Sequence, residues 1–219
     1  MLTKAKEQLV RSLQSKKGRQ ENELCLVEGK KVIETAGQAV QWTFSRKDSA
    51  RFDELVSTKT PQDVAGVAKI PKWSTADMAS RKTIVVLDGV QDPGNVGAIL
   101  RLCLGFDASL MLVESADVTS PKVVRASVGA LFQVPWMVVP REDVLRAVLA
   151  FDRQVYRLEQ GEGSTLNKKI TPPCVLIAGS EGRGIQLDVS GPSISIAHNV
   201  ALESLNVGHA LAIVLHGWF

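Results

Sequence analysis

The stretch "TIVVLDGVQDPGNVGAILRLC", residues 83–103, places an apolar run, a polar turn and a helical pattern in direct succession. The run at 83–90 has the nearly continuous β-branched character of a strand that is buried on both faces. Pro93 and Gly94 predict a turn, and the spacing of apolar residues at 96–105 predicts a helix. A buried strand followed directly by a helix is the repeating unit of a parallel α/β sheet.

Similar apolar runs recur throughout the second part of the chain, separated by helical patterns such as "EDVLRAVLAF" at 142–151. Their nearly continuous Val, Ile and Leu content predicts a mostly parallel sheet covered by helices on both faces. The runs are "ASLMLVES" (108–115), "VPWMVVP" (134–140), "RQVYRLE" (153–159), "CVLIAGS" (174–180) and "SISIA" (193–197).

The front part of the chain has shorter elements. Apolar residues at helical spacing predict a helix from Leu2 to Leu13, and "SKKGRQ" at 15–20 predicts a basic loop. "LCLVEG" (24–29) and "AVQWTFS" (39–45) predict strands on either side of a helix at 30–38. Because "PKWSTADMASRK" (71–82) has the composition of a linker, we expect two α/β domains, at residues 1–76 and 77–219.

The composition is that of a globular protein, with 45% hydrophobic and 22% charged residues among 219. The net charge of +3 is unevenly distributed. Residues 1–80 carry 14 Lys and Arg against 10 Asp and Glu, whereas residues 81–219 carry 12 against 13. A basic front part is compatible with attraction to phosphates, and a solvated charged face explains it equally well.

The cysteines and the N-terminus bear on location. Cys25, Cys103 and Cys174 are widely spaced without a C-x-x-C pair, which favours buried thiols over a disulfide framework or a zinc site. The start "MLTKAKEQLVRS" lacks the apolar core of a secretory signal, and no apolar run is long enough to span a membrane. We therefore expect a cytoplasmic protein without a metal ion or a membrane partner.

Polar residues follow three of the predicted elements where ligand sites of parallel sheets gather. In the first segment Asn95 can cap the helix, and Arg101 lies six residues further along it. Arg101 either reaches solvent or pairs with a carboxylate, or it is a fixed cation for a phosphate or ribose.

The second segment is "AGSEGRGI" (178–185), and the third is "ESLNV" (203–207), which precedes an apolar helix that Ser204 or Asn206 can cap. The glycines of the second segment either reverse the chain or allow a ligand to approach the backbone. The G-K-S/T ending of a phosphate-binding loop is missing, which disfavours a nucleotide-triphosphate-dependent enzyme. Glu181 needs a partner in this apolar neighbourhood, and Arg101 is the expected one.

Together these motifs resemble the SpoU, or TrmH-like, branch of the SPOUT RNA methyltransferases. The resemblance rests on N-x-G-x-x-x-R at residues 95–101, G-S-E-G-x-G at 179–184 and E-S-L-N-V at 203–207, in the family's order and spacing over residues 83–216. "ASVGALFQVP" (126–135) is similar to the middle segment of that family. The front part resembles the ribosomal-protein-like domain that often precedes it.

The resemblance implies an α/β-knot catalytic domain with a deep C-terminal trefoil knot, preceded by a small RNA substrate-binding domain. It further implies a homodimer that binds S-adenosylmethionine and methylates a ribose 2′-hydroxyl of RNA. The implied catalytic residues are Asn95, Arg101, Glu181, Ser204 and Asn206. The implied cofactor contacts are Ala178, Gly179, Gly184, Ile196 and Leu205, and the basic segment adds Lys16, Lys17 and Arg19 as RNA contacts.

The sequence departs from the family where relatives commonly read I-P-M, because it has Ile196, Ala197 and His198, and it has Gly208 and His209 after "SLNV". These differences bear on the shape of the cofactor pocket. Two roles stay open for Arg101, since guanidinium holds its proton: stabilising the developing alkoxide, or positioning an RNA phosphate that takes part in the proton transfer. Ribosomal RNA is the expected substrate; the alternatives are transfer RNA and a non-catalytic ribosome-assembly factor.

Overall fold

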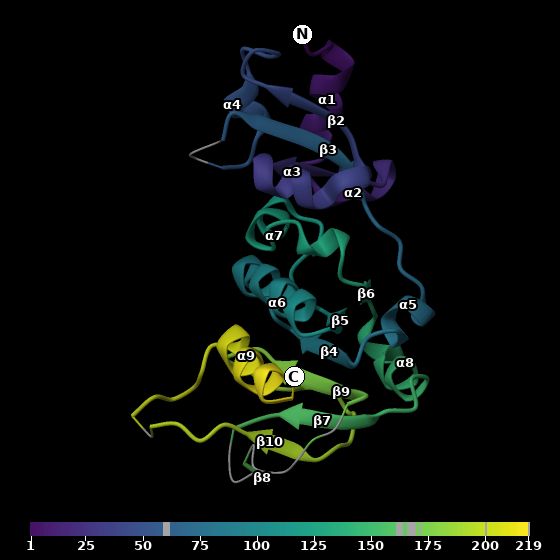
Figure 1. The fold of residues 1–219 in the computed structure, drawn as a ribbon, viewed down its shortest axis with the longest axis vertical. Helices are drawn as coiled ribbons and strands as arrows, with labels where there is room; N and C mark the ends of the chain where they lie inside the picture. Colours follow the sequence, from purple (N-terminus) through teal and green to yellow (C-terminus); the bar gives the residue numbers. More distant parts are fainter. Residues whose placement is uncertain (59–61, 161–163, 166–169, 171, 200, 219) are drawn as a thin grey trace. The chain divides into compact units, whose positions relative to one another are not determined.

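A computed structural model of the chain describes residues 1–58, 62–160, 164–165, 170, 172–199 and 201–218 (Figure 1). Two compact units divide the chain. Unit 1 comprises Met1–Lys72 and Asp117–Gln133, and unit 2 comprises Trp73–Ala116 and Val134–Phe219. A segment from the middle of the chain therefore belongs with the front part.

Unit 1 is built on a three-stranded antiparallel sheet of order β1-β3-β2. The strands predicted near residues 24–29 and 39–45 are confirmed, and the core lies under Phe44 and Phe52, whose rings pack edge to face at 5.5 Å. The elements are α1 (Lys4–Ser12), α2 (Lys16–Asn22), β1 (Leu24–Glu28), α3 (Lys30–Ala36), η1 (Gly37–Ala39), β2 (Val40–Ser45), α4 (Phe52–Leu55) and β3 (Val64–Lys69).

The basic segment at 15–20 is not the predicted loop, because most of it forms helix α2. The Ser15 side chain caps the helix by accepting a hydrogen bond from the Gly18 N–H at 3.0 Å. Gly18 has no room for a side chain, since a Cβ there would lie 2.1 Å from the Ser12 carbonyl oxygen. Lys16 and Lys17 remain exposed on the first turn, whereas Arg19 is buried.

The segment 117–133 packs within unit 1 through α7 (Pro121–Ala126) and η2 (Ala130–Phe132). Arg125 of α7 donates to the buried carboxylate of Glu28 in β1 at 3.1 Å. Gly129 has φ +82°, and a Cβ there would lie 2.8 Å from the Thr35 Cβ in α3. Any other residue at 129 would therefore be both strained and crowded.

Unit 2 contains a seven-stranded sheet of order β6-β5-β4-β9-β7-β10-β8, in which every pairing of neighbouring strands is parallel. The prediction of a parallel sheet is confirmed, and each of the six predicted apolar runs contains a strand. The strands are β4 (Thr83–Asp88), β5 (Ala108–Val113), β6 (Trp136–Val138), β7 (Gln154–Leu158), β8 (Ser164–Thr165), β9 (Cys174–Gly179) and β10 (Ser193–Ser195).

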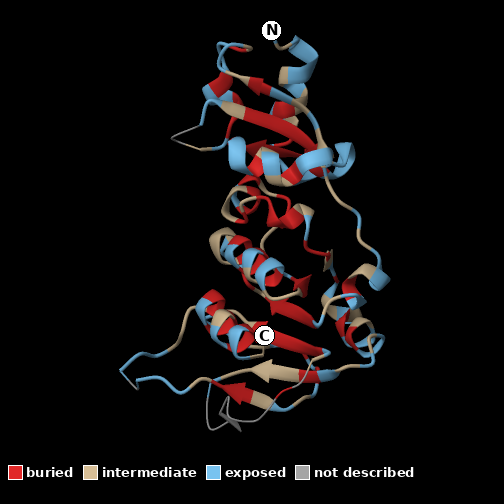
Figure 2. Cartoon of the chain, viewed as in Figure 1, coloured by how far each residue is buried: buried red, intermediate tan, exposed pale blue. Residues whose placement is uncertain are grey.

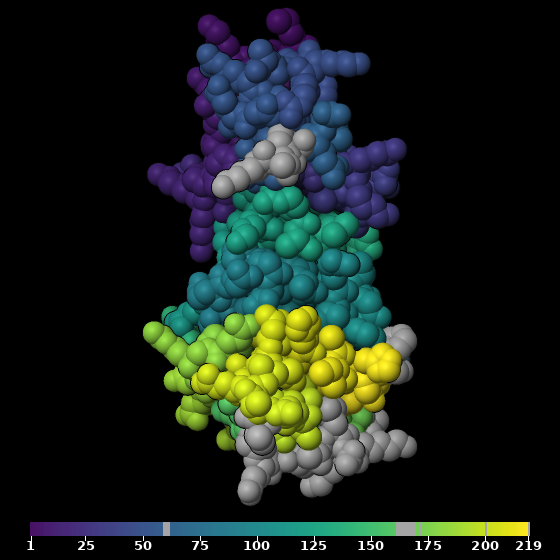
Figure 3. All heavy atoms as spheres, turned by 90° about the vertical axis from the view of Figure 1, so that its left-hand side faces the viewer, coloured from purple at the N-terminus to yellow at the C-terminus, as the bar shows by residue number. Residues whose placement is uncertain are grey.

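Helices cover both faces of this sheet, as expected (Figure 1). α6 (Pro93–Gly105) and α9 (Val207–Trp218) lie side by side on one face, and the same pair faces the viewer in Figure 3. α5 (Thr75–Ala79) and α8 (Val144–Leu149) lie on the other, with the short η3 (Arg141–Asp143) before α8. β4 and β5 are buried at every residue (Figure 2). No described helix has both the length and the apolar character needed to cross a membrane.

Candidate functional site

The carboxyl ends of β4, β5 and β9 lie level in the sheet of unit 2. The register pairs Asp88 at the end of β4 with Val113 of β5 on one side and with Gly179 of β9 on the other. The loops that follow these strands therefore emerge together at one edge, which is where parallel sheets hold their ligands.

Asp92, rather than Asn95, caps helix α6. Its side chain accepts a hydrogen bond from the Asn95 N–H at 2.8 Å, and Pro93 supplies the fixed φ that suits the first helical position. The prediction that Asn95 caps the helix is therefore wrong. Asn95 is the third residue of α6, and its side-chain amide donates to the Glu181 carboxylate at 3.3 Å.

Asn206 completes a polar cluster with Asn95 and Glu181. Its amide donates to Glu181 Oε1 at 2.7 Å and to Asn95 Oδ1 at 3.0 Å. Its own oxygen accepts from the backbone N–H groups of Gly208 and His209, so Asn206 also caps α9, as was predicted for Ser204 or Asn206. Helix capping thereby fixes the direction in which the Asn206 amide points.

Arg101 lies apart from this cluster. Six residues correspond to about 600° around an α-helix, so Arg101 lies roughly 240° from Asn95 on α6. Its side chain is exposed, lines neither cavity described below, and forms no ion pair with any residue in the described part of the chain. Glu181 is bound by two amides, and the expected ion pair with Arg101 is absent among the described residues.

The glycine-rich segment after β9 folds back on itself. Ser180 and Gly184 form a β-bridge, and Gly184 adopts φ +63°. A Cβ at Gly179 would lie 2.1 Å from the Gly184 carbonyl carbon and 2.4 Å from the Ile185 nitrogen. The turn therefore requires glycine at 179, and it carries Glu181 at its exposed tip.

A cavity of about 1030 Å³ lies on one side of this turn, and we call it the cofactor cavity. Its lining includes all five predicted cofactor contacts together with Ser204 and Glu181. The sequence did not single out Glu159, whose pKa is lowered because Arg157 donates to it, or Gln160, which donates to the Glu203 carbonyl oxygen at 2.6 Å. The His198 ring lies 2.7 Å from the Ile196 carbonyl oxygen.

The cofactor cavity suits S-adenosylmethionine chemically. Leu158, Ile185 and Ala210 provide apolar surface for an adenine ring, while Glu159 and Glu203 provide carboxylates for ribose hydroxyls and for the cofactor's positive charges. The glycines of the 179–184 turn have no side chains that would keep a ligand away from the backbone. These residues would bind and orient the cofactor.

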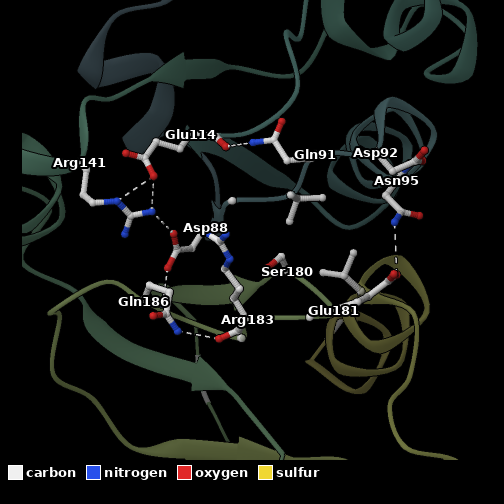
Figure 4. Close-up of a pocket in the computed structure, with 15 residues that line it drawn as sticks. Asp88, Gln91, Asp92, Asn95, Glu114, Arg141, Ser180, Glu181, Arg183 and Gln186 are labelled. Carbon is white, nitrogen blue, oxygen red and sulfur yellow. Dashed lines mark hydrogen bonds and ion pairs between the residues drawn. The ribbon is translucent and has the colours of Figure 1, made fainter.

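A second cavity of about 520 Å³ lies on the other side of the turn, and we call it the β4–β5 cavity (Figure 4). Arg141 bridges Asp88 at 2.8 Å and Glu114 at 2.6 Å. Asp88, only 1% exposed, also accepts from the backbone of Gln186 and Leu187. These residues were missed in the sequence, although a lone Asp at the end of an apolar strand was a visible signal.

Arg19 is one of the three residues predicted to contact RNA, and the structure contradicts that prediction. It is 3% exposed, because its guanidinium donates to the carbonyl oxygens of Leu13 and Gln14, to Thr119 and to Asp117, all within unit 1. Arg19 is therefore buried and held by unit 1, and it is not exposed to a phosphate. In the described residues no cluster of three or more His, Cys, Asp or Glu could hold a metal ion.

Two cavities thus adjoin the glycine-rich turn at the carboxyl edge of the parallel sheet, and Glu181 on this turn lines both of them. The family model described as "SpoU rRNA Methylase family" matches residues 82–216. The chain belongs to this family.

Individual relatives agree with the family assignment. A 23S rRNA (adenosine(1067)-2′-O)-methyltransferase of Streptomyces azureus is 33% identical, with 77% of this chain and 66% of that protein covered, so the chain spans just under two thirds of that relative. A Porphyromonas gingivalis structure assigned to the TrmH family has 30% identity and a TM-score of 0.82 over 100% of this chain and 98% of that one. An rRNA methyltransferase from Sinorhizobium meliloti with AdoMet bound has 25% identity and a TM-score of 0.85 over 99% and 95%.

Proposed function

We propose that the protein transfers the methyl group of S-adenosylmethionine to a ribose 2′-hydroxyl of RNA, and that ribosomal RNA is its substrate. The observation that carries the proposal is the cluster of Asn95, Glu181 and Asn206, which forms where the two cavities meet. Membership of the SpoU family and the relatives named for 23S rRNA support it.

Bound S-adenosylmethionine supplies an activated methyl group, so the protein's task is positioning and charge stabilisation. Glu181 holds the amides of Asn95 and Asn206, and these amides orient the ribose. Ser204, in the lining of the cofactor cavity, contacts the ribose or the cofactor. Arg101 is the cation that stabilises the developing alkoxide or positions an RNA phosphate.

We propose a homodimer formed through the outer surface of α6 and α9. Leu104 of α6 and Ile213 of α9 are 41% and 43% exposed and give this surface apolar area. Arg101 of α6 is also exposed, and it lines neither cavity of its own chain. A dimer formed through this surface would position Arg101 beside a catalytic site.

The finer architecture is proposed on the family resemblance. Residues 77–219 form the SPOUT methyltransferase domain, with a deep trefoil knot near the C-terminus, and residues 1–76 form the RNA substrate-binding domain. The exposed Lys16 and Lys17 at the start of α2 contact RNA. The proposed substrate is ribosomal RNA, free or in a ribosomal particle, and the proposed location is the cytoplasm. Transfer RNA is the alternative substrate, and a non-catalytic assembly factor is the alternative role.

The test uses purified protein, S-adenosylmethionine with a tritiated methyl group, and unmodified ribosomal and transfer RNA in separate reactions. Label at one ribose of ribosomal RNA supports the proposal, and label in transfer RNA alone replaces its substrate. Arg101→Ala should lower transfer at least 100-fold while cofactor affinity changes less than threefold. Wild-type transfer by Arg101→Ala would remove Arg101 from the mechanism, and cofactor binding without any transfer would favour the assembly factor.

A further inference from the structure

Four of the five predicted cofactor contacts lie outside the lining of the β4–β5 cavity, although this cavity shares a wall with the cofactor cavity. The shared wall is the turn at 180–184 together with Val207. Asn95 lines only the β4–β5 cavity, whereas Glu181 lines both. A reaction that takes place at Asn95 and Glu181 therefore has the cofactor cavity on one side and the β4–β5 cavity on the other.

The geometry of a nucleotide determines what must lie on that other side. The reacting hydroxyl is on C2′, and the nucleobase is bonded to the neighbouring carbon, C1′. A ribose held at Asn95 and Glu181 therefore places its base in the space next to them. A volume of about 520 Å³ falls in the range of small-molecule sites and is ample for one base.

The charges of the lining argue against a phosphate in this cavity. Four carboxylates line it, from Asp88, Asp92, Glu114 and Glu181, against two guanidinium groups. Arg141 is already paired with two of these carboxylates, and Figure 4 shows the Arg183 side chain extending toward Asp88. A neutral ligand that donates hydrogen bonds fits this surface better than an anion.

Hydrogen bonds within the lining engage the donors of two glutamine side chains and leave their oxygens as acceptors. The side-chain amide nitrogens of Gln91 and Gln186 both donate to backbone carbonyl oxygens, of Glu114 and Arg183. Since a carbonyl oxygen can only accept, this fixes both amides with their oxygens toward other partners. Arg141 contacts Oε2 of Glu114, so within the described residues Oε1 has no ion-pair partner. The hydrogen bond from Arg141 also lowers the pKa of Glu114 and keeps it an anionic acceptor.

We propose that the β4–β5 cavity binds the base of the nucleotide whose ribose is methylated, and that it selects guanine. Guanine carries adjacent donors, N1–H and the N2 amino group, on its Watson–Crick edge, whereas uracil carries a single N–H there. Gln91, Gln186 and Glu114 supply acceptors for that edge. The base would have to leave its stack to enter, as with other enzymes that act on single nucleotides. This inference rests on the proposed ribose methylation.

The first test measures turnover. RNA in which the mapped target nucleotide is replaced by each of the four bases should show kcat/KM at least tenfold higher for guanosine than for uridine. Gln91→Ala and Gln186→Ala should reduce this ratio to below threefold, with cofactor affinity unchanged. Gln154→Ala is the matched control, because Gln154 is an exposed glutamine of unit 2 that also donates to a backbone carbonyl oxygen but lines neither cavity. A mapped target other than guanosine, or an unchanged ratio in both variants, would overturn the assignment.

The second test does not require turnover and separates this inference from the proposed activity. Protein saturated with S-adenosylhomocysteine is titrated with guanosine and with uridine, followed by NMR. We expect guanosine to bind at least tenfold more tightly, and Gln91→Ala to remove most of the difference. Equal binding of the two nucleosides overturns the base pocket even if RNA is methylated, whereas absence of methylation with selective guanosine binding overturns only the proposed reaction.

Discussion

Arg19 and Asp117 form a buried ion pair across 98 positions of the sequence. The arginine side chain is 4% exposed and the aspartate side chain 21% exposed. Asp117 also accepts hydrogen bonds from the backbone and side chain of Thr119, so both charges have several partners. This pair joins helix α2 to the segment that leads into α7, within unit 1.

Removal of one partner of this ion pair should destabilise the protein strongly. Arg19→Ala leaves the Asp117 carboxylate without its cation, at a cost of about 3–5 kcal/mol in the free energy of unfolding. Urea unfolding measures the change. The double variant Arg19→Met/Asp117→Leu removes both charges and should recover most of the loss. A change below 1 kcal/mol for Arg19→Ala would show that the pair is not buried as described.

The two lysines before Arg19 should behave oppositely. Lys16→Ala/Lys17→Ala removes exposed charges, so the free energy of unfolding should change by less than about 0.5 kcal/mol. If these lysines contact RNA, the affinity for RNA should fall several-fold and its dependence on salt should weaken. Filter binding at several salt concentrations measures both. Unchanged RNA affinity would exclude the lysines from the interface.

Glycines 179 and 182 provide a matched pair of substitutions in the turn. Gly179→Ala places a Cβ against the backbone of Gly184 and Ile185, so the turn must open and cofactor affinity should fall at least tenfold. Gly182→Ala meets no atom within 4 Å and should change affinity less than threefold. Isothermal titration with S-adenosylmethionine compares them. Equal effects would show that crowding at residue 179 does not shape the cavity.

The three cysteines should be unreactive in the folded protein. Burial raises the thiol pKa of Cys25 and Cys103 to about 12 and that of Cys174 to about 11. The thiolate that reacts with alkylating agents is therefore scarce at pH 8, and the sulfur atoms are also covered. Iodoacetamide labelling followed by mass spectrometry should find three reactive thiols in denaturant and none within the same time in buffer. Rapid labelling of the folded chain would contradict this.

The ion pair between Glu114 and Arg141 should contribute to stability in a pH-dependent way. The hydrogen bond from Arg141 lowers the folded-state pKa of Glu114 below its ordinary value of 4.5. The contribution is therefore fully present above pH 4.5 and is lost as pH falls through the folded-state pKa. Urea unfolding between pH 3 and pH 7 should show a flatter acid limb for Glu114→Gln than for the wild type. Identical acid limbs would mean that the pair makes no contribution.

The sequence predicts the sheet of unit 2 well because the buried parallel strands are almost continuously apolar and end in polar turns. The sequence also predicts that Asn95, Glu181 and Asn206 lie close together, since they follow or precede elements whose ends meet at one edge of the sheet. It does not predict the capping role of Asp92, because Asp and Asn both suit a helix start. Glu181 binds Asn95 and Asn206, which lie 86 and 25 positions away, and Arg19 binds Asp117, which lies 98 positions away. Periodicity does not report such distant contacts.

The segment 117–133 changes what the front part of the chain is. The polypeptide passes from one unit to the other three times, at 72–73, 116–117 and 133–134. Deleting the first 72 residues would leave buried apolar side chains of that segment, such as Val123, Val124 and Leu131, without the surface that covers them. Residues 1–72 are therefore not an independent domain joined to the rest by one linker, because unit 1 also needs residues 117–133. The chain that follows β5 and the chain that enters β6 are both covalently continuous with unit 1.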